Sequence, residues 1–337
     1  MEEVKKTDSE PDAENETIEP TDTAHFSADI KRLIDQAEDA RLNCMKQYES
    51  RSHMAFSLGL LCVILGSCAF GWFFFYKFQF LPGLLFLALG IVPYFLLSQF
   101  KMKPLQEYEL QHKNVFMPKL AKALGGLKYR PKSGIKAKMM GPAKILPAFD
   151  QYIAEDCFAG TYKEIKMILS EARLSHSKRK DGYVFDGIFV LLELPADRFK
   201  GHTIITADHQ ATKQWKGKRW KDLQQITINN QKLASTFEVF SDAPQEGESL
   251  ASDEILEHFA ELSVEFDKAP LSVSFYRGKY IFIMIPYEVD MFETSNLYLP
   301  VTTSVQAQRC KKEIEQILSI IDLLSLYKPK DSPDKAT

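Results

Sequence analysis

The sequence predicts an α+β fold: a two-helix transmembrane hairpin followed by a cytosolic, mainly antiparallel sheet domain with a C-terminal helix. Residues 54–76 and 80–100 contain no Asp, Glu, Lys or Arg. At a rise of about 1.5 Å per residue, each run covers roughly 30 to 35 Å, enough for a hydrocarbon core about 30 Å thick. Because lipid cannot hydrogen-bond an exposed backbone, residues 77–79 are expected to form the turn between two antiparallel spans. The weaker alternative is a pair of buried core helices in a soluble protein.

Basic residues on either side of the two runs predict the orientation of the hairpin. Lys77 is the only basic residue in the turn, whereas six basic residues flank the runs on the other side. These six are Arg41, Lys46, Arg51, Lys101, Lys103 and Lys113. The positive-inside rule therefore places both termini, and everything after residue 100, in the cytoplasm.

The charge and the cysteine content limit what the rest of the chain can be. The 337 residues carry a net charge of -3, but residues 1–24 hold nine acids and two lysines. This segment has too little apolar surface to order itself, so we expect a disordered acidic tail. The five cysteines form no CxxC pair, which is typical of a reducing compartment without disulfides or structural zinc.

The pattern along the chain gives the domain organisation. The tail at 1–24 is followed by an amphipathic juxtamembrane helix at 25–53, for which Ser27 is the predicted cap. The hairpin then occupies 54–100, with spans at 54–76 and 80–100, and juxtamembrane helices follow at 101–126. The α+β domain extends over 127–328 and is followed by a disordered tail at 329–337. Small residues four apart, Ala55 with Gly59 and Ser67 with Gly71, favour close packing of the two spans.

Within the α+β domain, short apolar runs broken by Gly, Pro and Asp predict strands. These runs are residues 127–130, 144–149, 162–173, 183–194, 202–206, 225–228 and 236–240. A helix is predicted at 252–262 with Ser252 as its cap, and a hairpin pairs 271–276 with 280–286 around Arg277 and Gly278. A long loop at 287–303 leads to the C-terminal helix, which is expected to begin at Ser304.

Three carboxylates in FDQYIAED, those of Asp150, Glu155 and Asp156, are candidates for acid–base catalysis or for a divalent cation site. The favoured alternative is a polar turn in which Asp150 caps a backbone amide. His202, Asp208 and His209 in GHTIITADH are candidate metal ligands, but residues seven apart on a strand point to opposite faces. Cys157 is expected to be a buried cysteine rather than a nucleophile. We therefore expect no metal and no cofactor.

The most suggestive stretch is KQWKGKRWK, residues 213–221. Its basic residues and tryptophans are Lys213, Trp215, Lys216, Lys218, Arg219, Trp220 and Lys221. Tryptophan favours the headgroup region, and lysine and arginine are attracted to an anionic leaflet, so the stretch is a candidate contact with the membrane surface or a partner. Stacking on single-stranded nucleic acid is a less favoured alternative. The remaining alternative is a solvated loop whose tryptophans fold back onto the sheet.

Several phrases resemble an uncharacterised bacterial membrane-protein family, DUF3137. They lie at residues 145–174, 185–208, 237–244 and 271–293, and the resemblance extends over residues 42–327. It implies a bacterial inner-membrane protein with a cytosolic α+β domain and a LemA-like membrane protein as a partner. It implies no catalytic residues. After residue 244, where the family shows an arginine and Leu-Thr-Pro, this chain has QEGESLASDE.

Together these observations predict a non-enzymatic, membrane-anchored cytosolic scaffold or binding module. It would engage a protein partner, the anionic inner leaflet or a second copy of the chain. The alternative is a membrane-bound metal-dependent or hydrolytic enzyme that uses Asp150, Glu155 and Asp156, or His202 and His209.

Overall fold

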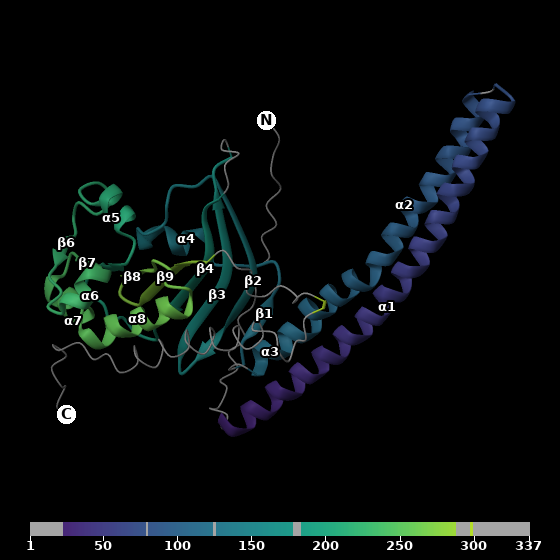
Figure 1. Cartoon of the computed structure of the whole chain (residues 1–337). Coiled ribbons are helices and arrows are strands. Elements are labelled where there is room, and N and C mark those ends of the chain that lie inside the picture. Colours follow the sequence, from purple (N-terminus) through teal and green to yellow (C-terminus); the bar gives the residue numbers. More distant parts are fainter. Residues whose placement is uncertain (1–22, 79, 124–125, 178–182, 288–296, 299–337) are drawn as a thin grey trace.

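Two long antiparallel helices lead into a nine-stranded antiparallel sheet with helices on both faces (Figure 1). This computed structural model describes residues 23–78, 80–123, 126–177, 183–287 and 297–298. The predicted α+β class, with two apolar helices before the sheet, is confirmed. The predicted C-terminal helix, the C-terminal tail, most of the 287–303 loop and residues 1–22 of the predicted acidic tail lie outside the described residues. Residues 23–24, predicted to belong to that tail, begin the first helix.

The helical hairpin is longer than the two predicted apolar spans. Its segments are α1 (Thr23–Gly71), the π-helical turn η1 (Trp72–Tyr76), α2 (Phe80–Gln111), the π-helical turn η2 (His112–Phe116) and α3 (Met117–Ala123). The predicted juxtamembrane helix and the first span form one helix, so Ser27 lies inside α1 and does not cap it. Capping contributes only about 1 kcal/mol, too little to set where a long helix begins. Among the described residues, two helices are long and apolar enough to cross a membrane.

Small residues bring α1 and α2 into close contact. A Cβ atom built on Gly90 would lie 2.7 Å from the carbonyl oxygen of Cys62, and one on Gly66 would lie 2.9 Å from that of Phe86. Of the residues predicted to mediate this packing, Ala55 is buried and Gly59 faces the ring of Tyr94. The helices can therefore approach closely because two glycines oppose each other.

The sheet has the strand order β1-β2-β3-β4-β9-β8-β5-β7-β6, and every pair is antiparallel. The strands are β1 (Lys128–Arg130), β2 (Gln151–Tyr162), β3 (Ile165–Ser175), β4 (Tyr183–Glu193), β5 (Thr203–Thr206), β6 (Gln224–Ile226), β7 (Glu238–Ser241), β8 (Ser272–Tyr276) and β9 (Tyr280–Pro286). The predicted hairpin corresponds to β8 and β9, and Arg277 and Gly278 at its turn have positive φ angles of 49° and 76°. Because Tyr276 pairs with Tyr280, the loop has three residues, and left-handed residues of this kind are typical of short hairpin loops.

Two strand predictions are wrong. Residues 144–149 form no strand, and the polar stretch after them, read as a turn, begins the twelve-residue strand β2. β1 pairs with only part of β2, so the start of β2 is partly exposed and can be polar. The start of β2 therefore lacks the apolar alternation of a half-buried strand.

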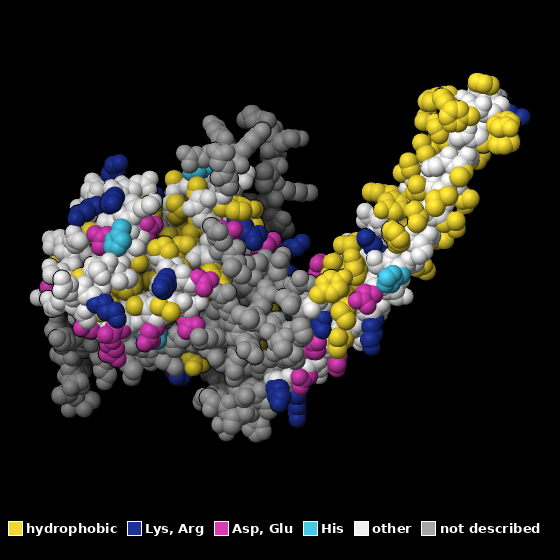
Figure 2. Space-filling model, in the orientation of Figure 1, with side chains coloured by type: hydrophobic (Ala, Val, Ile, Leu, Met, Phe, Trp, Pro, Cys, Tyr) yellow, Lys and Arg dark blue, Asp and Glu magenta, His cyan; other side chains and the backbone are white. Residues whose placement is uncertain are grey.

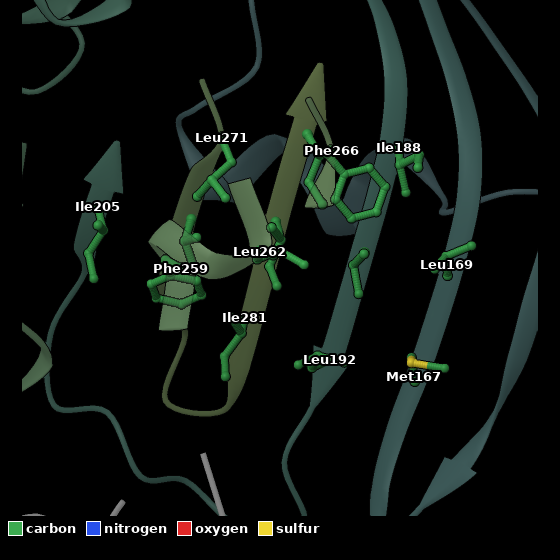
Figure 3. Packing of buried hydrophobic residues seen from close by; sticks show 14 of the residues in the cluster. Met167, Leu169, Ile188, Leu192, Ile205, Phe259, Leu262, Phe266, Leu271 and Ile281 are labelled. Atoms are coloured by element: carbon green, nitrogen blue, oxygen red, sulfur yellow. The ribbon is translucent and has the colours of Figure 1, made fainter. Parts of the chain in front are cut away.

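Two apolar clusters cover the two faces of the sheet. One packs α3, α6 (Gln231–Thr236), α7 (Pro244–Leu250) and α8 (Asp253–Glu265) on one face, and Figure 3 shows Phe259 and Leu262 of α8 above the strands. The other packs α4 (Ala137–Met140), the short 3₁₀ helix η3 (Gly141–Ala143) and α5 (His209–Trp215) on the opposite face. The predicted helix at 252–262 is α8, and Ser252 is the residue before its first turn.

The glycine contact between α1 and α2 gives a direct test of the hairpin. We expect Gly90→Leu to lower the stability of the hairpin by about 1 to 3 kcal/mol, because its side chain would collide with backbone that cannot move aside. Thermal unfolding of the full chain in mild detergent measures the change. Gly71→Leu is the matched control, since a Cβ atom there meets nothing within 4 Å. Equal losses in the two variants would contradict the packing.

Candidate functional site

The basic segment, residues 213–221, begins in α5 and continues into the turn before β6. Asp208 caps α5: its carboxylate accepts hydrogen bonds from the amides of Gln210 and Ala211, each at 3.0 Å. Gly217 has a φ angle of +77°, which lets the chain turn back after the helix. The segment therefore folds into a short helix and a tight turn against the sheet.

Both tryptophans of the basic segment are buried. Trp215 is 8% exposed and Trp220 is 2% exposed, and their rings meet edge to face with centroids 5.4 Å apart. The indole N–H of Trp220 donates to the carbonyl of Lys144 at 3.0 Å, and its ring packs on Phe240 of β7. This is the alternative in which the tryptophans fold back onto the sheet, so they are part of the core and do not form an exposed aromatic surface.

The cationic side chains of the basic segment have different roles. Lys213, Lys218 and Lys221 are exposed, and exposed Lys216 donates to Gln225 at 2.7 Å. The guanidinium of Arg219 lies 4.8 Å from the ring of Trp215 and donates to the carbonyl of Leu146. Partial burial lowers the pKa of Arg219. The lysines thus remain available to a ligand, whereas Arg219 holds the segment in place.

The three carboxylates proposed for catalysis bind different partners. Asp150 accepts hydrogen bonds from the amide and hydroxyl of Ser177, each at 3.2 Å, and these bonds lower its pKa. Glu155 lies 3.6 Å from the guanidinium of Arg173. The predicted capping role of Asp150 is confirmed, and the two side chains are parts of separate polar contacts.

Asp156 is buried at a bulge in β2, where the pairing with β3 shifts between Glu155 and Phe158. Its φ angle is 49°, a left-handed conformation that Asp tolerates better than most residues. The carboxylate accepts a hydrogen bond from the hydroxyl of Tyr129 and lies 3.1 Å from the ammonium of Lys113 in η2. This contact joins the sheet to the base of the helical hairpin.

The two histidines also lie in separate environments. Nε2 of His202 is 3.2 Å from the carbonyl of Ala143 and 2.9 Å from the hydroxyl of Ser274, and burial lowers its pKa to about 4. The ring is therefore neutral at pH 7, and the tautomer with its proton on Nε2 can donate to this carbonyl. His209 instead contacts Glu238 at 3.0 Å. Burial raises the pKa of Cys157 to about 11, so its thiol is protonated at pH 7.

Across the described residues, no group of three or more His, Cys, Asp or Glu side chains is arranged to hold a metal ion. The residues proposed for the alternative enzyme, Asp150, Glu155 and Asp156, are each bound by other side chains of the protein. The geometry therefore gives no particular support to an active site at these positions.

One contact that the sequence analysis missed lies at the base of the hairpin. Arg41, 3% exposed, forms a bidentate pair with Glu38 at 2.6 and 3.0 Å and donates to the carbonyl of Leu297. Leu297 also packs with Cys44 and Tyr108 between α1 and α2. A single arginine in a helix gives no sequence signal for a partner 256 residues later.

The fold and these contacts define a class of protein in which two long apolar helices carry an α+β domain built on one antiparallel sheet. Residues 183–326 match the model of the family described as "Protein of unknown function (DUF3137)". The match begins at β4 and confirms the resemblance to this family over residues 183–326. A search among curated proteins gave no match.

The burial of the tryptophans predicts a structural role that stability measurements can separate from surface contact. We expect Trp220→Ala to cost about 3 to 5 kcal/mol, because it leaves a cavity and removes the donor to Lys144. Lys218→Gln, in the same turn, is expected to change stability by less than about 0.5 kcal/mol. Denaturant unfolding of the full chain in detergent measures both. A neutral Trp220→Ala would show that the indole is not part of the core.

The contact between Lys113 and Asp156 predicts energetic coupling between hairpin and sheet. Asp156→Asn keeps a side chain that tolerates the left-handed backbone but removes the charge, and we expect a loss of about 1 to 3 kcal/mol. The loss is below that of a fully buried pair because the Lys113 side chain is 32% exposed. A double-mutant cycle with Lys113→Gln should give a coupling above about 0.5 kcal/mol. Additive losses would contradict a direct interaction.

Proposed function

We propose that this chain is a non-enzymatic, membrane-anchored module. The helical hairpin would hold the sheet domain at the cytoplasmic face of a bacterial inner membrane, where the domain binds a protein partner or the anionic leaflet. The observation that carries the proposal is the outward-facing apolar surface of the hairpin. Only 11% of the residues in the most apolar stretch of each long helix are buried, although the stretches have a mean hydropathy of 2.2.

Water disfavours an apolar surface of this size. Figure 2 shows hydrophobic side chains all along the end of the hairpin, and those of Phe56, Leu65, Leu89 and Phe95 are each about 60% exposed. Monomeric soluble proteins rarely expose apolar patches larger than a few hundred Å². Surrounding lipid removes this cost, and it requires that every backbone group be bonded within the helices.

The two ends of the apolar surface have the chemistry of membrane interfaces. At the turn, the exposed rings of Trp72 and Tyr76 stack with centroids 4.7 Å apart, next to Lys77. At the other end, the guanidinium of Arg51 lies 4.8 Å from the centre of the Phe100 ring. Aromatic and basic residues are enriched at these two levels of a bilayer. The polarity along the hairpin thus supports a span between them.

The stalk, residues 31–53 of α1 and 101–116 of α2 and η2, would carry the sheet domain below the membrane. The thiol of Cys44 donates to the carbonyl of Pro104 at 3.3 Å, and Arg41 and Lys113 contact the rest of the chain as described. These contacts favour a stalk that holds the domain in a defined position. A LemA-like membrane protein remains our proposed partner, on the resemblance to the family.

Extraction of the full chain from its membranes tests the proposal. We expect the protein to stay with the membrane in alkaline carbonate and high salt and to leave it only in detergent. Leu65→Arg with Leu89→Arg is expected to weaken insertion, because each arginine near the centre of a span costs about 2.5 to 3.5 kcal/mol. Gln47→Arg in the stalk is the control and should have no effect.

Protease digestion tests the orientation of the hairpin in the same cells. Protease added to intact spheroplasts should leave the sheet domain whole and should digest it after lysis. Release by salt would refute the anchor, whereas digestion from outside would refute only the cytoplasmic placement.

A further inference from the structure

The helices on one face of the sheet form a basic layer, which we define as residues 131–149 and 209–221. It contains no Asp or Glu and carries nine lysines and arginines: Lys132, Lys136, Lys138, Lys144, Lys213, Lys216, Lys218, Arg219 and Lys221. All except the half-buried Lys144 are exposed. Among the described residues, no carboxylate lies within ion-pair distance of any of the nine. The layer is therefore a cationic surface without internal neutralisation.

Two of the helices on the other face, α7 and α8, carry the opposite charge, whereas α3 and α6 on that face hold only the three lysines Lys119, Lys122 and Lys232. We define the acidic layer as α7 and α8, which contain no Lys or Arg and seven carboxylates: Glu246, Glu248, Asp253, Glu254, Glu257, Glu261 and Glu265. The two layers pack on opposite faces of the sheet, since the apolar residues of each belong to a different cluster. The domain thus has a charge difference across the sheet.

The two parts of the basic layer form one preassembled surface, although they lie far apart in the sequence. The indole of Trp220 and the guanidinium of Arg219 donate to the carbonyls of Lys144 and Leu146. From the strand below, the hydroxyl of Tyr276 donates to the carbonyl of Met139 at 2.6 Å. Little ordering is therefore required when a ligand binds the layer.

The basic layer also faces the direction of the apolar helices. In Figure 1, α4 and α5 lie on the upper side of the sheet, toward which α1 and α2 extend, and α7 and α8 lie on the lower side. In Figure 2, basic side chains lie at the top of the sheet domain and acidic ones gather along its lower edge, with some side chains of both signs between them. The charge difference across the sheet therefore runs toward the apolar end of the hairpin.

We propose that the basic layer binds the anionic headgroups of the membrane that holds the hairpin. This inference rests on the proposed anchoring function. The cytoplasmic leaflet has a negative surface potential, which attracts the basic layer and repels the acidic one, so the two layers together orient the domain. Because Trp215 and Trp220 are buried, the contact is electrostatic and inserts no aromatic side chain. It is therefore sensitive to salt.

Hydrogen exchange of the full chain in nanodiscs tests the inference. We expect exchange in residues 131–149 and 209–221 to slow by about fivefold when phosphatidylcholine is partly replaced by phosphatidylglycerol. Raising the ionic strength to about 1 M, where the Debye length is about 3 Å, should abolish the protection. The variant Lys136→Gln, Lys138→Gln, Lys213→Gln, Lys218→Gln should lose it as well.

The matched control removes the same charge outside the basic layer, by Lys163→Gln, Lys166→Gln, Lys232→Gln, Lys268→Gln, and should keep the protection. Equal exchange in the two lipids would overturn the inference and leave the anchor intact, because extraction with carbonate tests the anchor separately. Protection by polyglutamate without protection by phosphatidylglycerol would also overturn it, since the layer would then bind an acidic protein. Equal loss of protection in both quadruple variants would also overturn it, because the effect would then depend on the total charge of the protein and not on the basic layer.

Discussion

Burial of both faces of one antiparallel sheet is the constraint on which the rest of the structure depends. Antiparallel sheets often leave one face in water, but every residue of β8 is buried here. Residues on one face of its neighbours, such as Ile283, join one apolar cluster, and those on the other, such as Phe282, join the second. Helices must therefore cover the sheet twice. This requirement explains why short helical segments interrupt the strand sequence between β5 and β8.

Covering an apolar face of the sheet determines the residue types only on the inner side of each helical layer. In α8, Leu256 and Phe259 are buried, whereas the exposed positions between them are free to carry charge. The same holds for the basic segment, where Trp215 and Trp220 supply the packing and the lysines remain outside. The charge difference between the layers is therefore independent of what stabilises the fold, and it points to interactions outside the sheet domain.

The sequence predicted what depends on local pattern: the two apolar helices, the β8 and β9 hairpin and α8. It did not predict β2, because Asp156 lies at a bulge and is neutralised by Lys113, a residue 43 positions earlier. The basic segment was recognised, but its composition fits an exposed aromatic surface as well as a packed turn. What decides between them is the carbonyl of Lys144, 76 residues before Trp220, which accepts the indole hydrogen bond. Long-range contacts of this kind leave no periodicity in the sequence.

The joint between hairpin and sheet determines which layer can reach a membrane. The stalk segment of α1, residues 31–53, spans about 35 Å at the rise of an α-helix, and the sheet joins the hairpin near its base through α3 and the Lys113–Asp156 pair. The domain then lies beside the stalk rather than beyond its end (Figure 1). The acidic layer faces away from the apolar helices. A rotation that brought it toward an anionic leaflet would break the contacts of α3 and the Lys113–Asp156 pair, and it would also place the carboxylates next to headgroups of the same charge. The stalk and the sheet together thus favour one orientation, in which the basic layer faces the bilayer.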